Sequence, residues 1–360
     1  MNAITQLAQV GTSTWLDDLS RERIESGNLS EIIASKNIVG VTTNPAIFAA
    51  AMSKGTAYDA QIDQLKADGM KADEAVYAMS IEDVRAACDL FADIYHHSAG
   101  ADGRVSIEVD PRISEDADAT LAQARQLWKK VDRENVMIKI PATEGSLPAI
   151  ADALAEGISV NVTLIFSVPR YREVVATYIK GITRAAEAGL DVSKIHSVAS
   201  FFVSRLDTEV DRRLEKIGTE QALALRGKVG IANARRAYAV FTELFDAATL
   251  PEGANLQRPL WASTGVKNPE YPQDLYVSEL AGAHTVNTMP ESTIDAVLAG
   301  ENIHGDTLSG RAQAAEDLFK ELENIGIDFE DVFALLEREG VEKFVAAWNE
   351  LLELMEARLS

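Results

Sequence analysis

The chain has 360 residues, of which 47% are apolar and 25% are charged, a composition typical of a folded globular protein and not of a disordered one. Asp and Glu outnumber Lys and Arg by 56 to 34, so the formal net charge is −22 with neutral His, which argues against nucleic acid as a main partner. The single Cys cannot form an internal disulfide, and the chain has neither an apolar run of roughly 20 residues nor a start resembling a signal peptide, so we expect a cytoplasmic protein without membrane contact.

Eight short β-rich runs follow one another along the chain, and helix-like segments separate nearly all of them. The runs are Thr12–Asp17, Val39–Asn44, Val105–Asp110, Val136–Ile140, Ile158–Leu164, Ile195–Phe202, Pro259–Thr264 and His284–Thr288. The clearest helical segments are Val76–His96, Asp118–Asp132, Val168–Ala188 and Leu206–Ala247. Strands that alternate with helices form a parallel sheet, and eight such units predict a closed (β/α)8 TIM barrel. An open doubly wound sheet is the alternative. Such a sheet is expected to have a Gly-rich phosphate-binding turn after an early strand, and no G-x-G-x-x-G occurs in this sequence.

The C-terminal part, from Thr307 to Leu359, contains no strand signal. Apolar residues in it recur at helical spacing and would form one face: Val341, Phe344, Val345, Trp348, Leu352, Met355 and Leu359. We expect helices that pack on the barrel, although a helix that binds a partner would have the same pattern. No repeat or linker divides the chain, so residues 1–360 are predicted to form one barrel domain, with about 306–360 as its helical extension.

Polar side chains fall on one face of most predicted strands. Side chains alternate faces along a strand, whereas a barrel strand buried on both faces should be almost wholly apolar. Instead, Glu108, Lys139 and Asn161 each stand between apolar neighbours. In a closed barrel the polar face is the lumen, so these groups should converge at the C-terminal mouth, where barrel enzymes have their active sites. Half-exposed strands with polar residues facing water are the alternative, which is hard to reconcile with helices covering the sheet.

Lys139 is the residue on which the predicted chemistry depends. It lies between Ile138 and Ile140 within a strand, which does not fit a surface position. Burial disfavours the ammonium form, and a neutral amine can attack a ketone or aldehyde to form a Schiff base. The protonated imine then acts as an electron sink, so that the adjacent carbon–carbon bond can break or form. A structural ion pair of Lys139 with Glu108 or Asp17 is the alternative interpretation.

Imine chemistry also needs groups that move protons and groups that hold the substrate. Asp17 and Glu108 lie on the polar face near strand ends, and two carboxylates beside one lysine can differ in protonation. Arg205 and Lys267 follow the sixth and seventh strands, where barrel enzymes often bind phosphate. The neutral polar residues of the same strand ends suit sugar hydroxyls or a catalytic water: Thr42, Asn44, Asn161, Thr163 and Ser200. Each of these residues, taken alone, is also typical of a structural or surface position.

A metal site or a hydroxyl or thiol nucleophile has little support in the sequence. The five His residues form no H-E-x-x-H pattern, and the adjacent His96 and His97 would point in different directions on a helix. Cys88 lies in an Ala-rich segment that suits core packing, and no G-x-S-x-G occurs. The residues themselves therefore give little reason to expect a metal.

Four blocks resemble successive strand motifs of the transaldolase family, in the same order: VGVTTNPAIF at 39–48, VSIEVDPR at 105–112, VMIKIPAT at 136–143 and GISVNVTLIFS at 157–167. The resemblance covers Thr12 to about Met289, and the WLDDLSR block at 15–21 and the helical tail are similar to a longer bacterial subgroup. It implies a (β/α)8 barrel and a Schiff-base reaction without metal or cofactor. The implied reaction moves a dihydroxyacetone unit from sedoheptulose 7-phosphate to glyceraldehyde 3-phosphate. Its products are erythrose 4-phosphate and fructose 6-phosphate, in the non-oxidative pentose phosphate pathway.

The resemblance also implies roles for individual residues. Lys139 matches the Schiff-base lysine, and Asp17, chosen over Asp18 because it alternates with Trp15, matches the general acid/base. Glu108 matches the carboxylate that works through a water held with Thr163. The remaining matches are substrate-binding positions: Asn44 and Asn161 for donor hydroxyls, Thr42 and Ser200 as further contacts, and Arg205 for phosphate.

One departure from the family concerns the end of the seventh strand, where many members have Ser-x-Arg and the Arg contacts phosphate. Here Thr264 and Gly265 follow Ser263, so we expect Ser263 and Lys267 to share the phosphate. A related Schiff-base aldolase, similar to fructose 6-phosphate aldolase, would instead release the enamine, and Phe202 lies where the pocket could decide between the two. A non-catalytic sugar-phosphate sensor with an acidic contact tail is the alternative from another class. The expected partners are sugar phosphates, and both a monomer and a homodimer fit the sequence.

Overall fold

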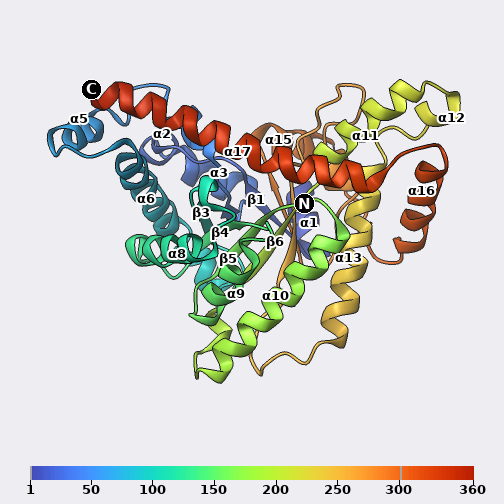
Figure 1. Cartoon of the computed structure of the whole chain (residues 1–360), viewed down its shortest axis with the longest axis horizontal. Coiled ribbons are helices and arrows are strands. Elements are labelled where there is room, and N and C mark those ends of the chain that lie inside the picture. Colours follow the sequence, from blue (N-terminus) through green and yellow to red (C-terminus); the bar gives the residue numbers. More distant parts are fainter. Residues whose placement is uncertain (1, 301) are drawn as a thin grey trace.

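The computed structural model describes residues 2–300 and 302–360, and its centre is a closed barrel of eight parallel strands (Figure 1). The strands follow chain order around the barrel, and the last pairs with the first. They are β1 (Thr12–Leu16), β2 (Gly40–Val41), β3 (Arg104–Glu108), β4 (Val136–Pro141), β5 (Val160–Ile165), β6 (Ser197–Phe202), β7 (Arg258–Ala262) and β8 (Thr285–Met289). The predicted (β/α)8 barrel is therefore confirmed, with all eight expected strands in place.

Strand β2 is shorter than predicted. The Thr42 N–H still donates to the Leu16 carbonyl at 2.9 Å, so the chain continues along β1 beyond the end of β2. At Asn44, however, the side chain accepts a hydrogen bond from the Ile47 N–H and caps the next helix. The polar end of the predicted strand therefore belongs to the turn that opens the helix.

Helices cover the outside of the barrel and occupy most of the segments between strands. The α-helices before the C-terminal extension are α1 (Ala3–Val10), α2 (Arg21–Glu25), α3 (Asn28–Lys36), α4 (Pro45–Met52), α5 (Asp59–Ala67), α6 (Ala72–Leu90), α7 (Ala92–His97), α8 (Ala117–Val131), α9 (Leu147–Ala155), α10 (Val168–Glu187), α11 (Ser204–Ile217), α12 (Glu220–Leu223), α13 (Val229–Ala247), α14 (Leu275–Ser278) and α15 (Glu291–Gly300). Short 3-10 helices lie at η1 (Pro111–Ile113) and η2 (Val192–Lys194). Across the part of the chain that the structure describes, no helix has both the length and the apolar composition that crossing a bilayer requires.

The predicted helical segment Leu206–Ala247 is divided into α11, α12 and α13. Gly218 ends α11 with a φ of 72°, and Gly227, after α12, has a φ of 70°. Both values lie in the left-handed region that favours glycine. Gly218 is the C-cap of α11, and Gly227 lies in the turn between α12 and α13. At Gly227 a side chain would also meet the ring of Tyr271.

Alternation along the strands separates the buried apolar side chains into two clusters. Met137 belongs to a cluster that also contains Trp15 and Val286, which share its side of the barrel wall. Ile138 and Ile140 belong to the other cluster, which packs the strands against the helices. Lys139 therefore shares the lumen face with Met137, as the alternation predicted.

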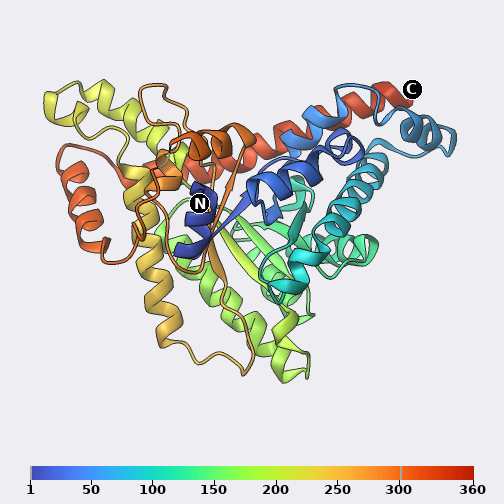
Figure 2. The same ribbon diagram turned by 180° about the vertical axis from the view of Figure 1, so that it is seen from behind.

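The expected C-terminal helical extension is present and consists of α16 (Ala312–Asn324) and α17 (Phe329–Leu359). Figures 1 and 2 show α17, in red, running across one end of the barrel. It contacts α11 towards one end and α4, α5 and α6 towards the other. Its buried face includes Phe344, Trp348 and Met355. Gly340 allows the close approach of α17, because a Cβ there would lie 3.0 Å from the Phe166 ring.

Candidate active site

A cavity of about 250 Å³ lies at the C-terminal ends of the strands, beneath α17. It is the place where barrel enzymes have their active sites. The predicted site residues that line it are Asp17, Thr42, Asn44, Lys139, Ser200, Phe202, Arg205, Ser263 and Lys267. The other three, Glu108, Asn161 and Thr163, are buried in β3 and β5 and do not line the cavity.

The amine of Lys139 is held in the barrel wall by two partners. Its Nζ atom lies 2.8 Å from Oε1 of Glu108 and donates a hydrogen bond to the Thr43 carbonyl at 2.6 Å. Strand register sets this arrangement, because Glu108, Lys139 and Asn161 occupy neighbouring positions on β3, β4 and β5. Lys139 is only 5% exposed and Glu108 only 7%. The structural ion pair considered from the sequence is thus present, and it borders the cavity.

Burial is the largest influence on both carboxylates near this amine. It raises the pKa of Glu108 to about 7, against the opposing effect of the Lys139 charge and with a further upward contribution from Asp17. Burial likewise raises the pKa of Asp17, whereas the charge of Lys139 and a hydrogen bond from Thr42 lower it. That hydrogen bond runs from Thr42 Oγ1 to Asp17 Oδ1 at 2.8 Å. Both carboxylates can therefore hold a proton nearer to neutral pH than an exposed carboxylate can.

A chain of side-chain hydrogen bonds orients the amide of Asn161. The Ser200 hydroxyl donates to Asn161 Oδ1 at 2.7 Å, and Asn161 Nδ2 donates to Ser106 Oγ at 3.1 Å. Two residues further along β5, Thr163 Oγ1 is buried and has no hydrogen-bond partner among the described residues. The register of β5 then shifts at Leu164, which has a φ of 61°. Thr163 is therefore a buried hydroxyl with unused bonding capacity.

The β6 and β7 sides of the cavity supply cations. Arg205 at the start of α11 places its guanidinium carbon 5.0 Å from the centre of the Phe202 ring, and its Nη1 atom is buried without a hydrogen-bond partner among the described residues. Burial lowers the pKa of Arg205, although the group keeps its positive charge at neutral pH. Ser263 turns the chain out of β7 with a φ of 55°, and its hydroxyl lies 2.9 Å from that of Ser204. Lys267 follows on the same loop and completes this side of the cavity.

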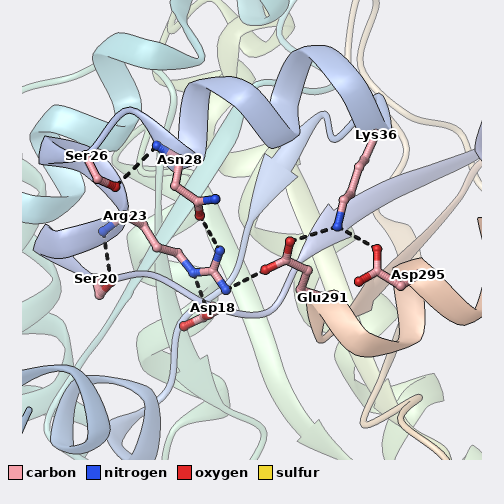
Figure 3. A network of polar contacts seen from close by, with 8 residues as sticks. All are labelled: Asp18, Ser20, Arg23, Ser26, Asn28, Lys36, Glu291 and Asp295. Carbon is pink, nitrogen blue, oxygen red and sulfur yellow. Dashed lines mark hydrogen bonds and ion pairs between the residues drawn. The ribbon is translucent and has the colours of Figure 1, made fainter.

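Asp17 and Asp18 are adjacent in sequence but belong to different parts of the site. Asp17 lines the cavity, whereas Asp18 accepts a hydrogen bond from Arg23 at 2.8 Å (Figure 3). Arg23 also binds Glu291 at 2.7 Å, and Glu291 binds Lys36 at 2.8 Å. We call these four residues, Asp18, Arg23, Glu291 and Lys36, the ionic clasp. It ties the segment after β1 to α3 and to α15, which follows β8.

Sequence reasoning missed several residues of the site. The hydroxyl of Thr288 bonds that of Thr42. Thr288 lies two residues after Val286 on β8 and therefore shares its face, and this spacing could have identified Thr288 as a site residue. The Thr43 carbonyl left no signal because it is a backbone group. Phe344, expected only to pack, lies with its ring centre 5.9 Å from Lys139 Nζ, and Lys343 beside it also lines the cavity.

A closed barrel with a buried lysine, the buried carboxylate of Glu108, the carboxylate of Asp17 and a polar cavity at its C-terminal mouth defines the class of protein: an enzyme built on a (β/α)8 barrel. The sequence profile of the Transaldolase/Fructose-6-phosphate aldolase family matches residues 14–355, and the chain belongs to this family. Transaldolases from Mycolicibacterium smegmatis and Mycolicibacterium paratuberculosis are each 58% identical to it over 99% of this chain and 97% of theirs. The transaldolase of Mycobacterium leprae is 57% identical over 99% of this chain and 96% of its own. The chain is accordingly an enzyme and a transferase, and the resemblance seen in the sequence is confirmed.

Proposed function

We propose that the protein catalyses the transaldolase reaction through a Schiff base on Lys139. The donor is a ketose phosphate such as sedoheptulose 7-phosphate, and the acceptor is glyceraldehyde 3-phosphate. The products are erythrose 4-phosphate and fructose 6-phosphate, as in the non-oxidative pentose phosphate pathway. The observation that carries the proposal is the buried Lys139–Glu108 pair, with its 2.8 Å separation, at the wall of a polar cavity.

The pair supplies the nucleophile that the reaction needs. A lysine attacks a carbonyl only as the neutral amine, and its extra proton must first go to a nearby base. Glu108 lies within proton-transfer distance of Lys139 Nζ, and its pKa of about 7 makes it able to accept that proton. Attack by Nζ on the ketose carbonyl followed by loss of water gives the protonated imine.

The carbon–carbon step divides the substrate. A base removes the proton from the hydroxyl next to the breaking bond, the bond's electron pair moves into the imine, and an aldose phosphate leaves. The dihydroxyacetone unit stays on Lys139 as an enamine, which attacks the acceptor aldehyde in the reverse sense. We assign the hydroxyl proton to Asp17, which lines the cavity and is held by Thr42. Hydrolysis of the last imine restores the free amine.

The remaining residues are assigned by their positions. Glu108 and Thr163 would hold the water that is lost and regained, which suits the unused bonding capacity of Thr163 Oγ1. Asn44, Asn161 and Ser200 would bind donor hydroxyls, with Phe202 shaping the pocket beside them. The substrate phosphate would bind to Arg205, Ser263 and Lys267, which the cavity wall brings together. No step requires a cofactor.

Borohydride trapping tests the proposal. Reduction in the presence of fructose 6-phosphate should attach a dihydroxyacetone or hexose unit to the peptide that contains Lys139, and mass spectrometry should locate it there. The Lys139→Arg variant keeps the positive charge but cannot form an imine, because guanidinium stays protonated. It should fold normally, judged by circular dichroism, and should show neither adduct nor turnover. An unmodified wild-type protein, or a variant with retained turnover, would exclude the mechanism.

A fructose 6-phosphate aldolase activity is the second candidate, because the matching family profile includes both enzymes. The two reactions share the enamine and differ in its fate. Transaldolase passes it to an acceptor aldehyde, whereas the aldolase protonates it and releases dihydroxyacetone. Incubation with fructose 6-phosphate, with and without erythrose 4-phosphate, distinguishes them: we expect sedoheptulose 7-phosphate to form and little free dihydroxyacetone. A sugar-phosphate sensor would bind these compounds without any borohydride adduct.

A further inference from the structure

Helix α17 contributes a cation to the cavity in addition to Arg205, Lys267 and the Lys139 amine. Lys343 lines the same cavity as Arg205 and Lys267, but it comes from the helix that crosses the mouth of the barrel, not from a segment that follows a strand (Figure 1). The next residue, Phe344, is buried and lies against the Lys139 amine, so the register of α17 over the site is fixed at this point. α17 also contacts α11, the helix on which Arg205 lies.

Lys343 has an internal partner. Its Nζ atom lies 2.7 Å from Oε2 of Glu339, one turn earlier on α17. The same carboxylate acts on Arg205: burial lowers the pKa of that guanidinium, and the negative charge of Glu339 is the largest opposing effect. The charge of Glu339 thus acts on two of the four cationic side chains of the cavity, Lys343 and Arg205, while Nη1 of Arg205 has no hydrogen-bond partner among the described residues.

We propose that Lys343 is a ligand of the substrate's phosphate group and that Glu339 is its counter-ion in the free enzyme, which the phosphate displaces. This inference rests on the proposed function and adds to it a binding residue from the C-terminal extension. A phosphate offers several acceptor oxygens and up to two negative charges, so it can bind Lys343 and Arg205 together. It then replaces the negative charge and the hydrogen-bond acceptor that Glu339 provides to Lys343. The cation that a Ser-x-Arg pattern would place at position 265, where this chain has Gly265, is then supplied by α17.

Binding of inorganic phosphate, measured by isothermal titration calorimetry, tests this assignment without any need for turnover. Lys343→Met should weaken phosphate binding about tenfold, the size expected when one partly exposed charged hydrogen bond is lost. Glu339→Gln should strengthen phosphate binding, because the competing carboxylate is gone. Lys320→Met is the matched control, since Lys320 forms a similar surface pair with Asp317 at 3.5 Å on α16 and does not line the cavity. It should bind phosphate as the wild type does.

Steady-state kinetics then separate a phosphate ligand from a structural residue. Lys343→Met should raise KM for fructose 6-phosphate about tenfold and leave kcat/KM for unphosphorylated fructose unchanged. Equal losses for both sugars, phosphate binding in Lys343→Met equal to that in Lys320→Met, or unchanged or weaker binding in Glu339→Gln would overturn the proposal. Its failure is distinct from that of the proposed function, which would appear as the absence of a borohydride adduct on Lys139.

Discussion

The Lys139 amine and the Glu108 carboxylate lie 2.8 Å apart on adjacent strands, and both side chains are more than nine-tenths buried. Burying such a pair costs free energy, because each charged group loses its contact with water. The cost is offset only where the attraction between the charges and further hydrogen bonds replace the lost hydration. The further hydrogen bond from Lys139 to the Thr43 carbonyl offsets part of that cost. The pair therefore holds a proton where a carbonyl substrate would enter.

Glu108→Gln should lower kcat about 100-fold and change the pH profile. The pKa of Glu108 in the folded protein is about 7, so the ionised form that accepts a proton from Lys139 is lost as the pH falls through 7. Wild-type kcat/KM should decline below this pH, and the decline should be absent in Glu108→Gln.

Measurement of kcat/KM from pH 5 to 9 checks this prediction. Glu337→Gln is the control, because burial also raises the pKa of Glu337 although it does not line the cavity. The Glu337→Gln variant should keep the decline of kcat/KM below pH 7 that the wild type shows. An inflection near pH 7 that persists in Glu108→Gln would show that another group titrates there.

Asp17→Asn should separate imine formation from carbon–carbon cleavage. The amide can still accept the hydrogen bond from Thr42 but cannot take a proton from a substrate hydroxyl. We expect turnover to fall at least about 100-fold while borohydride still traps a donor on Lys139. Asp18→Asn is the control, since Asp18 bonds Arg23 outside the cavity, and it should change turnover far less. Loss of trapping in Asp17→Asn would instead place Asp17 in imine formation.

The ionic clasp should act on catalysis through the position of Asp17. Arg23→Met removes contacts with Asp18, Asn28 and Glu291, whereas Lys36→Met removes contacts with Glu291 and Asp295 only (Figure 3). Each substitution should lower the free energy of unfolding by about 1 kcal/mol, as expected for partly exposed ion pairs.

Arg23→Met should in addition lower kcat several-fold, because the segment after β1 is released next to Asp17, and Lys36→Met should leave kcat nearly unchanged. Urea unfolding and steady-state kinetics on both variants check the comparison. Equal kcat values in the two variants would show that the clasp contributes to stability alone.

Asp207 should make the stability of the fold depend on pH. It is buried on α11, accepts hydrogen bonds from the Gly230 N–H at 2.7 Å and the Tyr276 hydroxyl at 2.6 Å, and has a pKa raised by burial to about 6. Because this pKa lies above the unfolded value of about 3.8, the favourable contribution is complete below pH 4 and is lost as the pH rises through 6.

Asp207→Asn should remove this dependence while keeping an acceptor for the Gly230 N–H. The wild type should lose about 2 kcal/mol of stability relative to the variant between pH 4 and pH 7. Urea unfolding at both pH values gives the difference directly. Parallel changes in the two proteins would show that Asp207 does not titrate in this range.

The barrel and most of the site could be predicted because a strand has a period of two. That period places Glu108, Lys139 and Asn161 on the lumen face independently of the conformation of the connecting loops. Because consecutive strands of the barrel are adjacent, the three residues are then neighbours. The shortness of β2 could not be predicted, since it depends on a capping hydrogen bond from the Ile47 N–H to Asn44 that competes with strand pairing. Nor could the position of α17, because its apolar face indicates burial without indicating which surface covers it.

The path of α17 also bears on the order in which the site is completed. The cavity wall runs from Asp17 to Ala347, so its roof comes from a part of the chain that leaves the ribosome long after the barrel strands. Until that helix docks, the cavity of a nascent barrel lacks the part of its wall that Lys343, Phe344 and Ala347 supply. Docking of the last helix is therefore the folding step that completes the wall around Lys139.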